Sequence, residues 1–293
     1  MKKKILILTI ICTIILTLTT GCFDRDELEN STITTTVYPI EYLVERLYKG
    51  ETKINSIYPN DENISTFKLT DKQLTDLSKT TTLFVYNGLT QEKEFAKSLI
   101  NRNKKIQTID VAWGLKYTYG IEELWLNPNN YLMLANTIKE DLKDFSASKY
   151  AAKEIDEQYG LLEEDLTTLD VELRQIGKVA RSKGNQTLVI AYDSLGFLEK
   201  YGFDIVNITN ESNITSSIKN KFKNKEYKYI LVDSKDNVTD SVKDLVDNYE
   251  AELIEINMML TLSDQEKENN DNYLTIMKDF LTTLSNITLK QNE

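Results

Sequence analysis

Residues 148–182, SKYAAKEIDEQYGLLEEDLTTLDVELRQIGKVARS, decide the fold. Their apolar side chains recur at alternating steps of four and three: Ile155, Tyr159, Leu162, Leu166, Leu169, Leu173, Ile176 and Ala180. This spacing predicts one helix of roughly 50 Å at 1.5 Å per residue. Such strict spacing is also typical of a coiled-coil dimer. Gly160 and Gly177 weaken that alternative by about 1 kcal/mol each relative to Ala, so we expect a strut that packs across two lobes.

Strand and helix signals alternate on both sides of this helix. The strand candidates are residues 32–37, 53–58, 82–86 and 106–111 before it, and 187–191, 204–208, 229–232 and 252–256 after it. Strands separated by helices imply parallel βαβ units. We therefore predict an α/β fold of two Rossmann-like lobes with parallel sheets, at residues 32–145 and 185–293, joined by one long backbone helix at 146–184.

The N-terminus reads as an export signal. MKKK precedes an apolar run over residues 5–18, which is short for a membrane span of about 20 residues. The ending Thr-Thr-Gly-Cys resembles a bacterial lipoprotein signal, although Thr19 stands where such signals prefer Leu. We predict a signal peptide at 1–21, a lipid on Cys22 and a polar tether at 22–31. An ordinary signal peptide or signal anchor with an incidental Cys is the alternative.

Composition and charge exclude several function classes. The chain carries −11, and loss of the three signal lysines would take the mature protein to −14 (−11 − 3). Nucleic acid is therefore not expected as a partner, because phosphate binding needs a basic face. The chain has no His, only Cys22 remains after cleavage, and neither a nucleophile elbow nor a Gly-rich phosphate loop occurs. We do not expect an enzyme.

Five stretches carry a resemblance to a known family. They are TVYPIEYLVERLY (36–48), FVYNGL (84–89), LWLNP (124–128), YDSLGFLEKYG (192–202) and NYLTIMKDFLTTL (272–284). In this order they resemble the zinc- and manganese-type metal-binding proteins of ABC importers. The resemblance implies an extracytoplasmic monomer, lipid-anchored to the bacterial cell membrane. Such a protein would capture a divalent metal (Mn or Zn) as cargo between its lobes and deliver it to an ABC permease and its ATPase.

The family's metal ligands are mostly His, and this chain has none. The positions that match them are Ser65, Glu123, Tyr192 and Asn257, of which only Glu123 keeps strong ligand character. Neutral oxygen groups would make a poor zinc site. Three acidic residues close to the matched positions could help to form an oxygen-rich site for Mn²⁺, Ca²⁺ or Mg²⁺. These helpers are Asp61, Glu62 and Asp193.

Less specific interpretations stay open for the same residues. Asp61 and Glu62 can be a solvated turn, Asp193 can sit at the start of a helix, and Tyr192 can be a packed residue of the cleft. The matched positions could equally form a polar pocket for a small organic ligand. We expect a solute-binding lipoprotein with an altered, His-free site. The alternative is a member that no longer binds metal and acts on another small solute, or as an adhesin or assembly partner.

Overall fold

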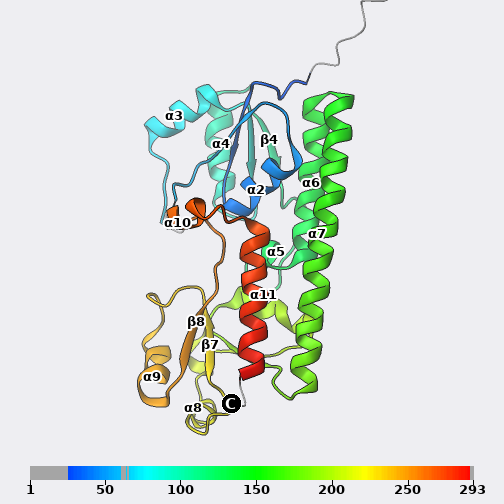
Figure 1. Ribbon diagram of the computed structural model, residues 1–293. Coiled ribbons are helices and arrows are strands. Elements are labelled where there is room, and N and C mark those ends of the chain that lie inside the picture. The colour runs from blue at the N-terminus through cyan, green and yellow to red at the C-terminus, as the bar shows by residue number, and fades with distance from the viewer. Residues whose placement is uncertain (1–25, 61–63, 65, 291–293) are drawn as a thin grey trace, which may run out of the picture.

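The computed structural model describes residues 26–60, 64 and 66–290 (Figure 1). The predicted signal peptide and the lipid anchor Cys22 lie outside these residues, as do Asp61, Glu62 and Ser65. In the part of the chain that is described, no helix is long and apolar enough to cross a membrane.

The N-terminal lobe is built on a parallel four-stranded sheet in the order β2-β1-β3-β4. Its strands are β1 (Thr32–Thr35), β2 (Lys53–Ser56), β3 (Leu83–Tyr86) and β4 (Gln107–Asp110). Helices α2 (Tyr38–Leu47), α3 (Asp71–Thr80) and α4 (Glu92–Arg102) connect them. β1 lies in the middle of the sheet and aligns Ile33 with Ile54 and Leu83. Its side chains are almost fully buried, as expected of a parallel sheet covered on both faces.

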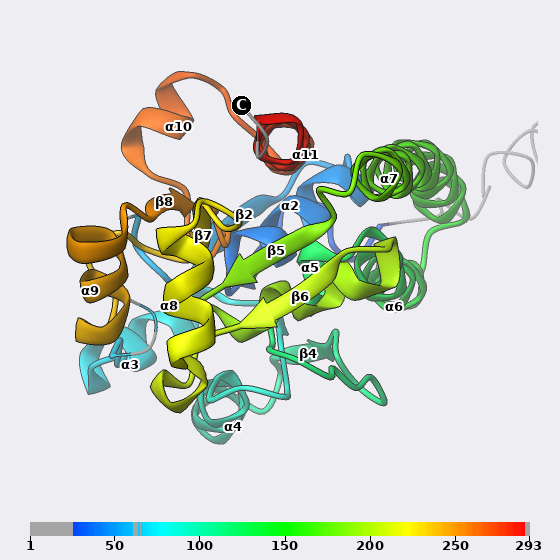
Figure 2. The ribbon, with the colours of Figure 1, turned by 90° about the horizontal axis from the view of Figure 1, so that it is seen from below.

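The C-terminal lobe repeats this order in the sheet β6-β5-β7-β8 (Figure 2). Its strands are β5 (Thr187–Ile190), β6 (Asp204–Asn207), β7 (Tyr229–Val232) and β8 (Glu252–Glu255). The connections contain the 3₁₀ segments η1 (Asp193–Tyr201) and η2 (Glu211–Asn213) and the helices α8 (Ser216–Lys223) and α9 (Asp240–Tyr249). The predicted α/β class with two parallel sheets is confirmed.

The predicted long helix is α7 (Lys149–Ser182), which runs along both lobes (Figure 1). The Ser148 side chain caps its first turn by accepting a hydrogen bond from the Ala151 N–H. Six residues of the predicted apolar stripe are buried and the other two are partly buried, because α7 packs against α2, α6 and α11. The stripe is thus covered within the chain, as a strut linking the lobes requires.

Four further helices lie among the described residues. They are α5 (Glu123–Leu126), α6 (Pro128–Ser146), α10 (Asp264–Glu268) and α11 (Tyr273–Lys290). We did not predict α6, although Asn127 caps it and Pro128 stands at its first position, both common signals of a helix start. One apolar core runs from Ile33 in the first sheet through Leu169 in α7 to Leu231 in the second. The lobes therefore share a continuous apolar interface.

Candidate functional site

A cleft of about 1160 Å³ lies between the two lobes. Parallel strands present their carboxyl ends at one edge, where open α/β sheets bind ligands. The cleft follows this rule. Residues that come just after strands line it: Tyr58 after β2, Asn87 after β3, Tyr192 after β5, Asp233 after β7 and Asn257 after β8.

The charged side chains that line the described part of the cleft are all acidic. They are Glu92, Glu122, Asp233, Asp236, Glu255 and Glu266. None of the ion pairs among the described residues involves any of them. We call them the cleft carboxylates. Carboxylates without cationic partners create a negative potential, which attracts and holds cations.

Glu122 is a buried cleft carboxylate that hydrogen bonds from the other lobe hold in place. It is 7% exposed and precedes the short helix α5. The hydroxyl of Ser194, in η1 of the other lobe, donates a hydrogen bond to Glu122 Oε2. The Tyr192 hydroxyl is also hydrogen-bonded to Glu122. Burial, the negative charge of Glu122 and this bond raise the pKa of Tyr192, so its hydroxyl stays protonated. Both supports of Glu122 are therefore neutral.

Asp233 lies on the C-terminal wall of the cleft. Burial raises the pKa of its carboxyl, and the negative charges of Glu122 and Glu255 raise it further. Hydrogen bonds from its own N–H and that of Ser234 only partly oppose this effect. The negative charges of Glu122 and Glu255 thus act on Asp233, and a bound cation would offset them.

Glu92 lies on the N-terminal wall, at the start of α4. Its side chain accepts a hydrogen bond from the Asn87 N–H at 2.8 Å and one from the Tyr58 hydroxyl at 3.4 Å. Burial nevertheless raises the pKa of Glu92 from its ordinary 4.5 to about 7. The residue is 2% exposed. This wall therefore holds a proton that the arrival of a cation would tend to expel.

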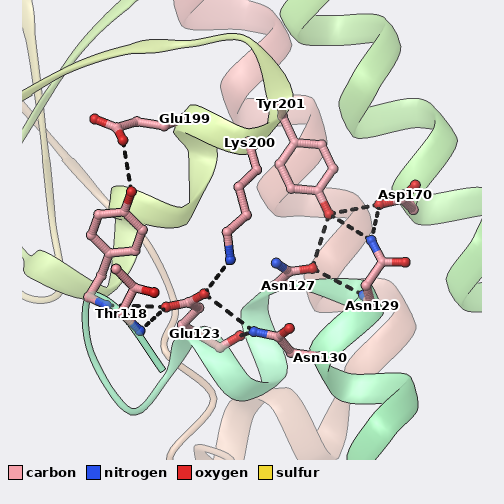
Figure 3. Close-up of polar contacts among 10 residues, drawn as sticks. Thr118, Glu123, Asn127, Asn129, Asn130, Asp170, Glu199, Lys200 and Tyr201 are labelled. Atoms are coloured by element: carbon pink, nitrogen blue, oxygen red, sulfur yellow. Dashed lines mark hydrogen bonds and ion pairs between the residues drawn. The ribbon is translucent and has the colours of Figure 1, made fainter. Parts of the chain in front are cut away.

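The structure places Glu123 outside the cleft lining, although its neighbour Glu122 is part of that lining. Glu123 Oε1 pairs with Lys200 Nζ at 2.7 Å, and Oε2 accepts hydrogen bonds from the N–H groups of Thr118 and Tyr119 (Figure 3). Burial alone would raise the pKa of Glu123, but these bonds outweigh it and lower the pKa. The cleft position expected at Glu123 is thus taken by Glu122, one residue earlier.

Two of the other predicted positions line the cleft. Tyr192 does so, and so does Asn257, whose amide hydrogen-bonds Glu266 and whose Oδ1 accepts the Met259 N–H at 2.7 Å. The predicted helper Asp193 is exposed, is not part of the lining and accepts a hydrogen bond from Asn207. Ser65, Asp61 and Glu62 lie outside the described residues.

The sequence patterns indicated none of the six cleft carboxylates, and they did not indicate Tyr58 either. A signal for Asp233 existed, because it directly follows a predicted buried strand whose carboxyl end faces the cleft. Glu92 carried no such signal, since an acidic residue at a helix start is usually solvated.

The donor set of the cleft is made of oxygen. Carboxylates, hydroxyls and the amide of Asn257 are ligands that suit hard cations such as Ca²⁺, Mg²⁺ and Mn²⁺. In the part of the chain that is described, no three His, Cys, Asp or Glu side chains come together closely enough to hold a metal ion. The described cleft is therefore a wide anionic chamber rather than a tight ligand cage.

Comparisons with known proteins agree with the fold described above. A family model described as zinc-uptake complex component A, periplasmic (ZnuA), matches residues 33–287. A search of curated proteins found no match. The Zn(II)-bound ZnuA-like domain of AdcA from Streptococcus pneumoniae is 17% identical, with a TM-score of 0.70 over 88% of this chain and 99% of that chain.

Two further solved structures are similar. The metal-dependent lipoprotein YcdH from Bacillus subtilis is 18% identical, with a TM-score of 0.72 over 87% of this chain and 98% of its own. The laminin-binding protein Lmb of Streptococcus agalactiae, described as a bifunctional adhesin and metal transporter, is 15% identical, with a TM-score of 0.69 over 88% and 99%. At these identities the structures show a shared fold. The family model spans nearly the whole described body, and the chain therefore belongs to the ZnuA family of periplasmic zinc-uptake components.

Proposed function

We propose that this protein is a membrane-anchored solute-binding lipoprotein that captures a hard divalent cation between its lobes and delivers it to an ABC permease and its ATPase. The observation that carries the proposal is the interlobe cleft, in which every charged lining side chain of the described residues is acidic. Family membership supports the transport role. The lipoprotein-like ending at Cys22 supports the anchor.

Glu122, Asp233 and Tyr192 form the centre of the proposed site. They come from both lobes, and their charges and hydroxyl interact with one another. A divalent cation here would relieve the mutual repulsion of the two carboxylates. The absence of His and thiolate ligands favours Mn²⁺, Ca²⁺ or Mg²⁺ held by oxygen over a tetrahedral zinc site of the usual kind.

The volume of the cleft favours a second candidate, a small organic cation. Pockets of about 300–1,000 Å³ hold drug-sized ligands, and this cleft reaches about 1160 Å³. Tyr58 and Tyr192 would offer ring faces to an ammonium group, and the cleft carboxylates would offer charge. On this alternative the chain has changed its cargo and kept the fold and the transport role.

Calorimetric titration of the untagged mature protein separates the candidates. Mn²⁺, Ca²⁺, Mg²⁺ and Zn²⁺ are titrated in turn, without a His tag that would supply the missing ligand type. We expect one ion per chain with a Kd of about 1 µM or tighter, which corresponds to about −8 kcal/mol. Glu122→Gln should weaken binding by more than tenfold, whereas Glu123→Gln should not. No saturable binding of any ion would retire metal capture in favour of organic cations.

The anchor has its own test. Cys22→Ala removes the sulfur that would carry the lipid. We expect the protein to move from the membrane fraction to the soluble extracytoplasmic fraction, because acyl chains provide the attachment and the body is strongly negative. A Cys12→Ala variant is the matched control, since Cys12 lies within the predicted signal and should leave attachment unchanged.

A further inference from the structure

One contact joins the wall of the cleft to the opposite lobe. Ser194 lies in the first turn of η1, shortly after β5. Its hydroxyl donates a hydrogen bond to Glu122 Oε2. Both residues are deeply buried, at 2% and 7% exposure. Since the hydroxyl is neutral, it can orient the carboxylate without forming an ion pair with it.

The backbone around Ser194 leaves it little freedom to move. Gly120 faces Ser194 so closely that a β-carbon at position 120 would collide with the Ser194 hydroxyl. Gly196 approaches the ring of Tyr119 in the same way. The turn at 119–122 and η1 therefore interlock through two glycines. A hydroxyl fixed by such packing holds one orientation before any cargo arrives.

The Tyr192 hydroxyl, which also hydrogen-bonds Glu122, does not duplicate this role. Tyr192 is a cleft residue whose hydroxyl could itself face the cargo. Ser194 is not part of the cleft lining, so it would act on a cation only through Glu122. Groups that hydrogen-bond a cation ligand from behind fix its direction, and their loss typically weakens metal binding by about 10- to 100-fold.

We propose that Ser194 is a positioning residue for cargo: its hydroxyl, locked by Gly120, aims the Glu122 carboxylate into the cleft. This inference rests on the proposed function, because it requires a cation on Glu122. It also predicts that the orientation of Glu122 is set in the empty protein. The lobes then need not close to build this part of the site.

A double-mutant cycle tests the proposal. The Kd for Mn²⁺ is measured by calorimetry for wild type, Ser194→Ala, Glu122→Gln and the double variant. We expect Ser194→Ala to raise the Kd about tenfold or more, and the double variant to bind no worse than Glu122→Gln alone, because Ser194 acts through Glu122. Should Mn²⁺ not bind the wild type, the same cycle uses whichever of Ca²⁺ or Mg²⁺ does.

A matched serine controls for structural damage. Ser78 is also buried, donates one hydrogen bond to the Thr75 carbonyl at 2.8 Å and lies in α3, away from the cleft. Ser78→Ala should leave the Kd unchanged, and unfolding in urea should show both alanine variants folded. If Ser194→Ala is itself unfolded, Ser194→Cys replaces it as a variant of similar size with a weaker donor.

The outcomes separate the two proposals. If Glu122→Gln weakens binding but Ser194→Ala does not, or if the two losses add, the positioning role is wrong and the proposed function stands. If Glu122→Gln leaves the Kd unchanged, or no divalent ion binds the wild type, the proposed site fails and the role of Ser194 fails with it.

Discussion

Adjacent residues Glu122 and Glu123 belong to two regions of opposite character. Glu123 lies in what we call the joint, formed by residues 118–120 and 123–130, η1 and the facing part of α7 (Figure 3). Burial alone would raise the pKa of both carboxyls there, yet Lys200 and two backbone N–H groups lower the pKa of Glu123. Arg174 and the Tyr201 hydroxyl likewise lower that of Asp170. The joint therefore supplies a cation for each buried carboxylate.

The cleft does the reverse. Burial raises the pKa of Glu92 and of Asp233, and their partners are hydroxyls and backbone N–H groups. Unpaired buried carboxylates cost stability. Carboxylates that serve the structure are thus neutralised within the chain, whereas those proposed to bind cargo have no cationic partner among the described residues.

Reversing one charge in the cleft should have the largest effect. In Glu122→Lys an ammonium group takes the place of the proposed cation, so we expect Mn²⁺ affinity to fall more than 100-fold in a calorimetric titration. Glu123→Gln, the neighbouring change in the joint, should keep the Kd within about threefold. Equal losses in the two variants would show that the joint and the cleft are not distinct regions.

Removing the cation of the joint should reduce stability rather than affinity. Lys200→Met leaves the Glu123 carboxylate, which is 1% exposed, without its charged partner. We expect the free energy of unfolding to drop by about 3 kcal/mol, at the lower end for a broken buried pair because Lys200 itself is half exposed. Urea unfolding at pH 7 measures the change. A drop below about 1 kcal/mol would make this ion pair an ordinary surface contact.

Glu92 should give the cleft a pH dependence opposite in sign to that of the joint. Because the pKa of Glu92 is raised from 4.5 to about 7, the folded state keeps a proton that the unfolded state releases. This contribution to stability is full below about pH 4.5 and is lost as pH rises through about 7. The loss amounts to about 2–3 kcal/mol as an upper figure. Glu92→Gln should remove this pH-dependent contribution.

The measurement is urea unfolding of wild type and Glu92→Gln from pH 5 to pH 8. The stability difference between them should change by about 2 kcal/mol in favour of the variant across this range. Glu123 serves as the opposite case. Its pKa is lowered, so its contribution is present at neutral pH and is lost as pH falls below the range in which an ordinary carboxyl titrates. If the free energy of unfolding changed with pH in the same way for wild type and Glu92→Gln, the pKa of Glu92 would not be raised.

Sequence patterns predicted the scaffold well because its signals are local. The four-three spacing of Ile155 to Ala180 fixed α7. Thr70 and Gln73 form the capping box that their spacing indicates. The family resemblance indicated Tyr192 and Asn257, and both line the cleft. The helix α6 was not predicted, although Asn127-Pro128 signals its start.

The site was harder to predict because it depends on where each side chain points, and not only on where the residue stands in the sequence. The motif LWLNP located the right turn, but successive residues in a turn or helix point about 100° apart. Spacing alone could not decide that Glu122 faces the cleft and Glu123 the joint. That choice is made by Lys200 and Ser194, which lie more than 70 residues away in sequence. Tertiary partners of this kind leave no local pattern.

The smallest effects should come from two glycines of α7, and they test how tightly the joint is packed. A β-carbon at Gly177 would collide with the backbone carbonyl of Tyr201, whereas one at Gly160 would meet nothing within 4 Å. Gly160→Ala should therefore stabilise the protein by up to about 1 kcal/mol, as expected for a helix position with room for a methyl group. Gly177→Ala should destabilise it by about 1–2 kcal/mol, because η1 must shift and the gain in helix propensity only partly offsets that. Thermal unfolding of the two variants gives the comparison directly. If both alanines stabilised equally, α7 and η1 would have room between them, and the joint could not hold Ser194 and Lys200 as firmly as the contrast with the open cleft requires.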